Sequence, residues 1–127
     1  MSRTSRQLSG DNAEALAEQF LHRHALTTLL RNYRCRLGEI DLIMLDPCDA
    51  PPDIVVFVEV RSRSLDGRVS ALESVDERKQ GKLILAARHF LAARPEFQEL
   101  PCRFDVVGFD APDQPPHWVR SAFEVDF

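Results

Sequence analysis

The sequence predicts an α/β fold in which helices flank a mixed five-stranded sheet, in the order helix, three strands, helix, two strands. Two observations support this prediction. Apolar residues recur at helical spacing in residues 11–24 and 76–94, and β-branched and aromatic residues fill five shorter runs. Because 127 residues suffice for one core but not for two, residues 11–127 are expected to form a single domain after a flexible tail at residues 1–10.

An apolar stripe predicts the first helix, and its members are Ala13, Leu16, Ala17, Phe20 and Leu21. Glu14 lies at the edge of this stripe, at the border between core and solvent. The helix dipole alone favours a glutamate in the first turn, so this position is also compatible with a purely structural role.

Three strands follow, at residues 25–36, 38–46 and 54–63. The third is rich in β-branched and aromatic residues, as expected of a central strand. Alternation predicts two largely apolar faces for the second strand, one with Glu39, Asp41, Ile43 and Leu45 and the other with Ile40, Leu42 and Met44. We therefore expect this strand to be buried on both sides.

The second and third strands each carry an acidic residue in an apolar setting. A connecting loop centred near Ala50 would place Asp41 directly opposite Glu59 in an antiparallel pair. Facing carboxylates repel, and burial adds several kcal/mol per charge unless a positive group neutralises it. A divalent cation is the simplest such group, since Mg²⁺ takes one or two protein carboxylates. The alternative is an ordinary ion network, with Arg61, Arg34 or Arg36 as the partners.

The second helix is expected to begin at the N-cap Asp76 and to end before Pro95. Lys79 falls on its apolar side and is aimed toward Glu59, although a lysine near a helix end can also reach solvent. Its remaining buried positions are Leu83, Ala86, Ala87, Phe90 and Leu91. Such a helix is long enough for a crossover, so the strand at residues 102–110 should run parallel to the Glu59 strand. A last alternating strand at residues 118–127 would form an edge.

Composition narrows the class of protein. The opening residues lack the apolar core of a secretory signal, and no apolar run reaches membrane-spanning length. The three cysteines and four histidines show no metal-ligand spacing, so we expect a cytoplasmic protein without disulfides. The net charge of −4 argues mildly against a DNA-coating protein. Basic residues nevertheless predominate between Arg61 and Arg94, which is compatible with a local basic surface and also with an ordinary mixed, solvated one.

Four runs together, RNYRCRLGEIDLIMLD, VFVEVRSRS, RKQGKL and RFDVV, resemble the YraN-like family of small bacterial proteins. That family is similar to Holliday-junction resolvases and has the restriction-endonuclease-like fold. The resemblance extends from about Gly10 to Val107. The pattern of such nucleases, Asp, a variable gap, then Glu-X-Lys, maps onto Asp41, Glu59 and Arg61. Arg61 stands where lysine is usual, and because arginine stays charged, the match supports metal binding better than catalysis.

The resemblance implies an endonuclease-like protein that uses Mg²⁺ or Mn²⁺ on structured or branched DNA. The metal ligands would be Asp41, Glu59, the carbonyl of Val60 and Glu14 on the first helix. Arg61 and Lys79 would hold the phosphate, and the residues assigned to DNA contact are Arg63, Arg68 and Lys82. Since resolvases act on two strands, a homodimer is consistent with this function.

Two other functions stay open at this stage. A nucleic-acid-binding module of the same fold could have lost turnover through Arg61. A protein-interaction scaffold could use the same charged residues only as a salt-bridge network. The sequence contains no nucleophile motif, phosphate-cradling glycine loop or cofactor fingerprint, which argues against a protease, kinase or oxidoreductase.

Overall fold

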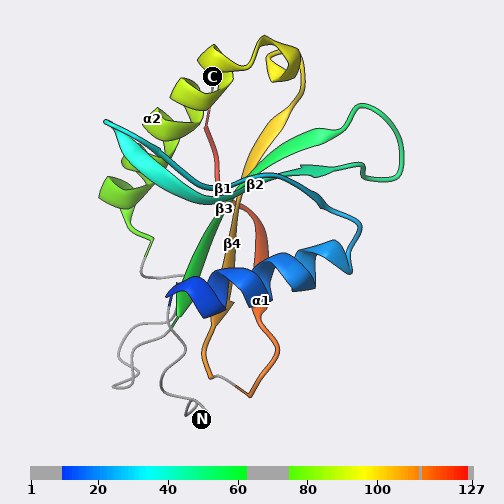
Figure 1. Cartoon of the computed structure of the whole chain (residues 1–127), viewed down its shortest axis with the longest axis vertical. Helices are drawn as coiled ribbons and strands as arrows, with labels where there is room; N and C mark the ends of the chain where they lie inside the picture. The colour runs from blue at the N-terminus through cyan, green and yellow to red at the C-terminus, as the bar shows by residue number, and fades with distance from the viewer. Residues whose placement is uncertain (1–9, 63–74, 112, 126–127) are drawn as a thin grey trace.

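The computed structural model describes residues 10–62, 75–111 and 113–125, and in these ranges a five-stranded sheet packs between two helices (Figure 1). In chain order the elements are α1 (Gly10–His22), β1 (Thr27–Cys35), β2 (Gly38–Asp46), β3 (Ile54–Ser62), α2 (Glu77–Ala93), the 3-10 helix η3 (Pro95–Phe97), β4 (Cys102–Phe109) and β5 (His117–Phe123). This order of helices and strands confirms the predicted one. Apart from Gly10, the predicted tail lies outside the described residues.

The sheet is mixed, with the strand order β1-β2-β3-β4-β5. Neighbouring strands are antiparallel except β3 and β4, which run parallel and are connected through α2. Both the parallel pair and the edge position of β5 confirm the predictions. The β2–β3 register pairs Leu42 with Val58 and Asp46 with Ile54. The ladder ends at the Leu42–Val58 pair, and just beyond it Asp41 lies beside Glu59, the residue that the loop length predicts as its neighbour.

Each face of the sheet carries its own apolar cluster. On the α2 face, Phe57 and Phe104 pack with Leu83 and Phe90 of the helix. On the α1 face the cluster joins the helix residues Ala13, Ala17 and Leu21 to the strand residues Met44, Val56, Val58 and Val107. Figure 1 shows α1 lying across one face of the sheet and α2 behind the other. Strands β2 and β3 are therefore buried on both sides, as predicted.

One residue contradicts the predicted alternation of β2. Ile40 is fully buried, but it packs in the α2-side cluster together with Ile43 instead of on the α1 side. Asn32 on β1, which lies between the partners of Ile40 and Leu42, has a left-handed backbone with φ 53°. A residue of this conformation distorts the ladder locally, so the strict two-residue period fails at the turn end of the hairpin.

Helix α2 begins and ends where its sequence predicts. The Asp76 side chain caps it by accepting a hydrogen bond from the Lys79 backbone N–H at 2.9 Å, and the helix ends two residues before Pro95. Helix α1 ends at His22, two residues earlier than predicted. Neither helix of the described chain has the length and apolar character needed to cross a lipid bilayer.

Candidate functional site

Asp41 and Glu59 meet at the end of the β2–β3 ladder. Glu59 alternates with Phe57 along β3, so its side chain lies on the α2 face, where it is only 4% exposed. Asp41 is half-buried, and its Oδ2 accepts a hydrogen bond from the Val60 backbone N–H at 2.8 Å. The apolar β3 strand therefore holds one carboxylate in the interior while its own backbone fixes the second beside it.

The surroundings of Glu59 disfavour its ionised form. Burial raises its pKa from the ordinary 4.5 to about 7, and the negative charge of Asp41 and a hydrogen bond between the two carboxyl groups act in the same direction. Lys79 and Arg61 oppose this shift only in part. Near neutral pH the two carboxyl groups can therefore be balanced either by a shared proton or by an added cation.

Two basic side chains contact the same oxygen of Glu59. Arg61 Nε lies 3.1 Å from Oε2, and Lys79 Nζ lies 3.5 Å from it. Lys79 thus points toward Glu59, as predicted. Of the ion pairs considered from sequence, the one with Arg61 is present, whereas Arg34 pairs with Glu39 at 3.2 Å. A metal ion at this site would compete with Arg61 and Lys79 for the Glu59 charge.

The structure does not gather the full predicted ligand set. Glu14 is half-buried on α1, the helix that covers the face opposite to Lys79. Within residues 10–62, 75–111 and 113–125, no three His, Cys, Asp or Glu side chains form a group that could hold a metal ion. The described site is a pair of carboxylates with two basic neighbours.

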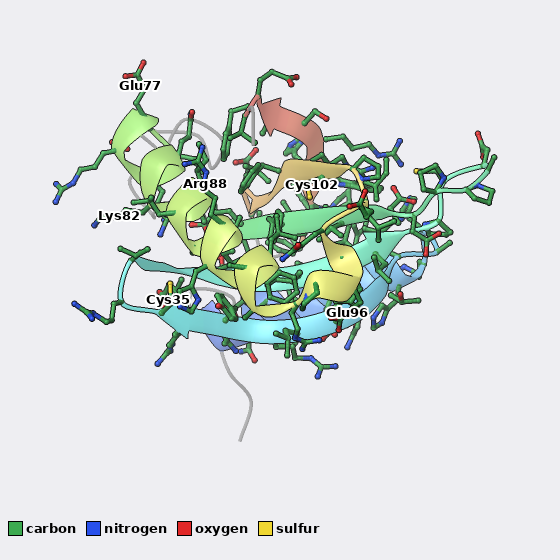
Figure 2. All side chains as sticks on the ribbon, turned by 90° about the horizontal axis from the view of Figure 1, so that it is seen from above. Cys35, Glu77, Lys82, Arg88, Glu96 and Cys102 are labelled. Carbon is green, nitrogen blue, oxygen red and sulfur yellow. The ribbon has the colours of Figure 1, made fainter. Side chains whose placement is uncertain are left out.

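Basic residues surround this pair on the solvent side. A pocket of about 310 Å³ is lined by Arg61, Asp76, Arg78, Lys79 and Lys82. Lys82 is exposed on α2 and projects at the end of the helix above the β1–β2 hairpin turn (Figure 2). The remaining residues predicted to contact DNA, Arg63 and Arg68, lie outside the described residues.

Sequence reasoning missed a second charged network, on the α1 face. Asp105 on β4 is 1% exposed and accepts hydrogen bonds from Arg103 Nε at 3.0 Å and Trp118 Nε1 at 2.9 Å. Arg103 also contacts Asp46 on β2 at 2.8 Å. The network connects β2, β4 and β5 across the sheet. The run RFDVV could have indicated this network, because alternation puts its arginine and aspartate on one face of the strand.

Comparison with known proteins identifies the family. The pattern of the uncharacterised protein family UPF0102 matches residues 13–109, which include every element of the site. A UPF0102 protein of Stutzerimonas stutzeri (strain A1501) is 53% identical over 120 residues, which cover 93% of this chain and 96% of the relative. Those of Pseudomonas savastanoi pv. phaseolicola (strain 1448A / Race 6) and Pseudomonas aeruginosa (strain LESB58) are 46% and 47% identical, over 98% and 96% of this chain and 99% and 97% of the relatives. The resemblance to the YraN-like family is thereby confirmed, and the chain belongs to the uncharacterised protein family UPF0102.

Proposed function

We propose that this chain is a nuclease-like protein of the restriction-endonuclease-like fold that cleaves structured or branched DNA with the help of Mg²⁺ or Mn²⁺. One observation carries the proposal. Asp41 lies beside the buried Glu59 at the end of the β2–β3 ladder, with Arg61 and Lys79 both within 3.5 Å of Glu59. Paired carboxylates beside basic groups are the parts that metal-assisted cleavage of a phosphodiester needs.

The residues at the site fit a magnesium-type ion. Mg²⁺ prefers oxygen ligands and keeps several waters, so two carboxylates are a sufficient protein contribution. Asp41, Glu59 and the carbonyl of Val60 would hold the ion, without the Glu14 ligand that the resemblance implies, because Glu14 lies on α1 and does not join this group. When bound, such an ion lowers the pKa of a water molecule and stabilises negative charge on the phosphate.

The basic residues would act on the DNA itself. Arg61 and Lys79 would orient the scissile phosphate and stabilise the charge that develops on it, since both already lie beside the carboxylate pair. Lys82, together with Arg63 and Arg68, would neutralise neighbouring phosphates of the same strand. Lys79 and Lys82 line the same pocket, which supports a continuous contact with the DNA backbone.

Cleavage of a labelled four-way junction or flap tests the proposal. With Mg²⁺ or Mn²⁺ the natural chain should cut, and Asp41→Asn and Glu59→Gln should abolish cutting while the protein stays folded. Glu96→Gln is a matched control, because Glu96 is an exposed carboxylate at the opposite end of α2 (Figure 2). Full activity in both site variants would exclude this site.

A second candidate function is supported by Arg61. Its guanidinium occupies the position next to Glu59 where nucleases of this kind carry lysine, and it cannot give up a proton at physiological pH. On this hypothesis the chain binds nucleic acid without cleaving it. Cutting that appears only in Arg61→Lys would favour the binding module, and cutting by the natural chain would exclude it.

A further inference from the structure

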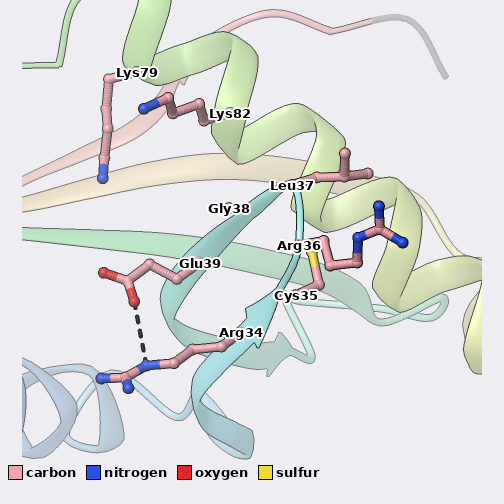
Figure 3. Close-up of a pocket in the computed structure, with 8 residues that line it drawn as sticks. All are labelled: Arg34, Cys35, Arg36, Leu37, Gly38, Glu39, Lys79 and Lys82. Atoms are coloured by element: carbon pink, nitrogen blue, oxygen red, sulfur yellow. Dashed lines mark ion pairs between the residues drawn. The ribbon is translucent and has the colours of Figure 1, made fainter.

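The β1–β2 turn packs directly against α2. A Cβ atom added to Gly38 would lie only 2.9 Å from the backbone oxygen of Lys82, closer than real Cβ contacts allow. Glycine at this position thus lets the turn approach the helix backbone. Between the two elements lies a pocket of about 430 Å³, which we call the turn–helix pocket (Figure 3). The tight Gly38 contact fixes the relative position of its two walls.

Positive charge dominates the turn–helix pocket. Its lining has four basic side chains, Arg34, Arg36, Lys79 and Lys82, and one carboxylate, Glu39. Figure 3 shows Lys79, Lys82, Glu39 and Arg34 extending to one side of the hairpin, whereas Arg36 points to the other.

Two of these basic groups already have acidic partners. Glu39 pairs with Arg34 at 3.2 Å, and Lys79 contacts Glu59 outside the pocket at 3.5 Å. In the part of the chain that the structure describes, no carboxylate pairs with Lys82. Among the described residues, the pocket therefore keeps an ammonium group without a paired carboxylate, next to an arginine that pairs with an exposed carboxylate.

The turn–helix pocket shares two lining residues with the smaller pocket of about 310 Å³. Lys79 and Lys82 line both pockets, and the smaller one is also lined by Arg61, which contacts Glu59. A nucleic-acid strand carries a phosphate about every 3.4 Å along the duplex axis, which suits a row of basic groups. The described residues that line the turn–helix pocket include no aromatic side chain on which a base could stack.

We propose that the turn–helix pocket binds a backbone phosphate of a nucleic-acid strand, at a position separate from the phosphate beside Glu59. Lys82 and Arg34 donate to this phosphate, and Glu39 competes with it for Arg34. The presence of another phosphate beside Glu59 rests on the proposed function. Binding in the turn–helix pocket needs neither a metal ion nor cleavage.

Anisotropy of labelled single-stranded and four-way-junction DNA, measured in EDTA at several salt concentrations, tests this proposal. Lys82→Gln should weaken binding several-fold and reduce the salt slope by about 0.7 for single strands or 0.9 for duplex. Glu39→Gln should tighten binding several-fold, because it releases Arg34. Arg23→Gln, which removes the same charge from an exposed residue just beyond α1, should leave binding unchanged.

Gly38→Ala separates pocket geometry from net charge. It alters no charge but forces the turn away from the Lys82 backbone, so it should weaken DNA binding, and its effect should be smaller when Lys82→Gln is already present. Equal effects of Lys82→Gln and Arg23→Gln, or no gain in Glu39→Gln, would overturn the proposal. The proposal would also be overturned if inorganic phosphate, added at millimolar concentration, binds the pocket as tightly as the oligonucleotide does.

The two proposals fail separately. If no metal ion supports cleavage but Lys82→Gln and Glu39→Gln still change DNA binding as expected, the turn–helix pocket is supported and the nuclease function is excluded. Cleavage that Asp41→Asn abolishes, with DNA binding unaffected by Lys82→Gln and Glu39→Gln, would do the reverse.

Discussion

The ammonium group of Lys79, in the first turn of α2, lies 3.5 Å from the carboxylate of Glu59 on β3. This contact joins the helix on one face of the sheet to the end of a central strand. Arg61 reaches the same carboxylate oxygen at 3.1 Å, and yet the pKa of Glu59 remains raised to about 7. Burial and Asp41 therefore outweigh both basic neighbours, and this imbalance can be measured.

The stability of the chain should fall as pH rises from about 4.5 to 7 because of Glu59. Its pKa is about 7 in the folded chain against an ordinary 4.5, so in this range the folded state holds a proton that the unfolded state has lost. The stabilisation is complete below pH 4.5 and gone above pH 7, and its size is on the order of 3 kcal/mol. Urea unfolding at a series of pH values measures it.

Glu59→Gln isolates this contribution from other titrating groups, because glutamine resembles the protonated form. The variant should match the natural chain at pH 4.5 and exceed its free energy of unfolding at pH 8. Parallel stability curves over this range would show that Asp41 and burial do not shift the pKa of Glu59 in solution.

Mg²⁺ should raise the melting temperature at pH 8 more than at pH 5. At pH 5 the protonated Glu59 carboxyl cannot bind a cation, whereas at pH 8 its charge is available to one. A ligand that binds only the folded chain adds about 2.7 kcal/mol at 100 times its Kd, which corresponds to several degrees. Differential scanning fluorimetry with and without Mg²⁺ measures the shift.

Asp41→Asn should remove the Mg²⁺ shift. Asp113→Asn, a change of the same kind in an exposed position between β4 and β5, should keep it. A shift that survives in Asp41→Asn would place the bound ion elsewhere on the molecule.

The carboxylate pair could be predicted from the sequence because its signals are local. The loop between β2 and β3 is symmetric about Ala50, and an acidic residue in an apolar strand is conspicuous. Strict alternation predicts the wrong face for Ile40, because alternation along β2 takes no account of the left-handed backbone of Asn32 on the neighbouring strand. Alternation is a property of regular strands and fails where the partner strand is distorted.

The turn–helix pocket and the Asp105 network could not be predicted in this way. Gly38 and Lys82 come from separate elements, and their close approach depends on how α2 crosses the sheet. Similarly, Asp46 and Arg103 lie on strands that flank β3, so their contact follows from the strand order and not from spacing along the chain.

Asp105→Asn should destabilise the chain by about 3 kcal/mol. The buried carboxylate accepts hydrogen bonds from Arg103, Trp118 and the Ser121 backbone N–H, and loss of its charge leaves Arg103 with less compensation. Urea unfolding measures the change, and Glu96→Gln, in an exposed ion pair, should stay within about 0.5 kcal/mol. Equal effects of the two substitutions would mean that the buried network does not hold β5 to β4.

The same substitution should have opposite effects at two glycines. Gly81→Ala should stabilise the chain by about 1 kcal/mol, because no atom lies within 4 Å of the added Cβ and alanine favours the helix. Gly38→Ala should destabilise it by about 1 to 3 kcal/mol, because the added Cβ meets the backbone oxygen of Lys82. Thermal and urea unfolding of both variants measure this contrast. A neutral Gly38→Ala would mean that the turn is free to move away from α2, in which case Arg34 and Lys82 would not be held on facing walls of one pocket.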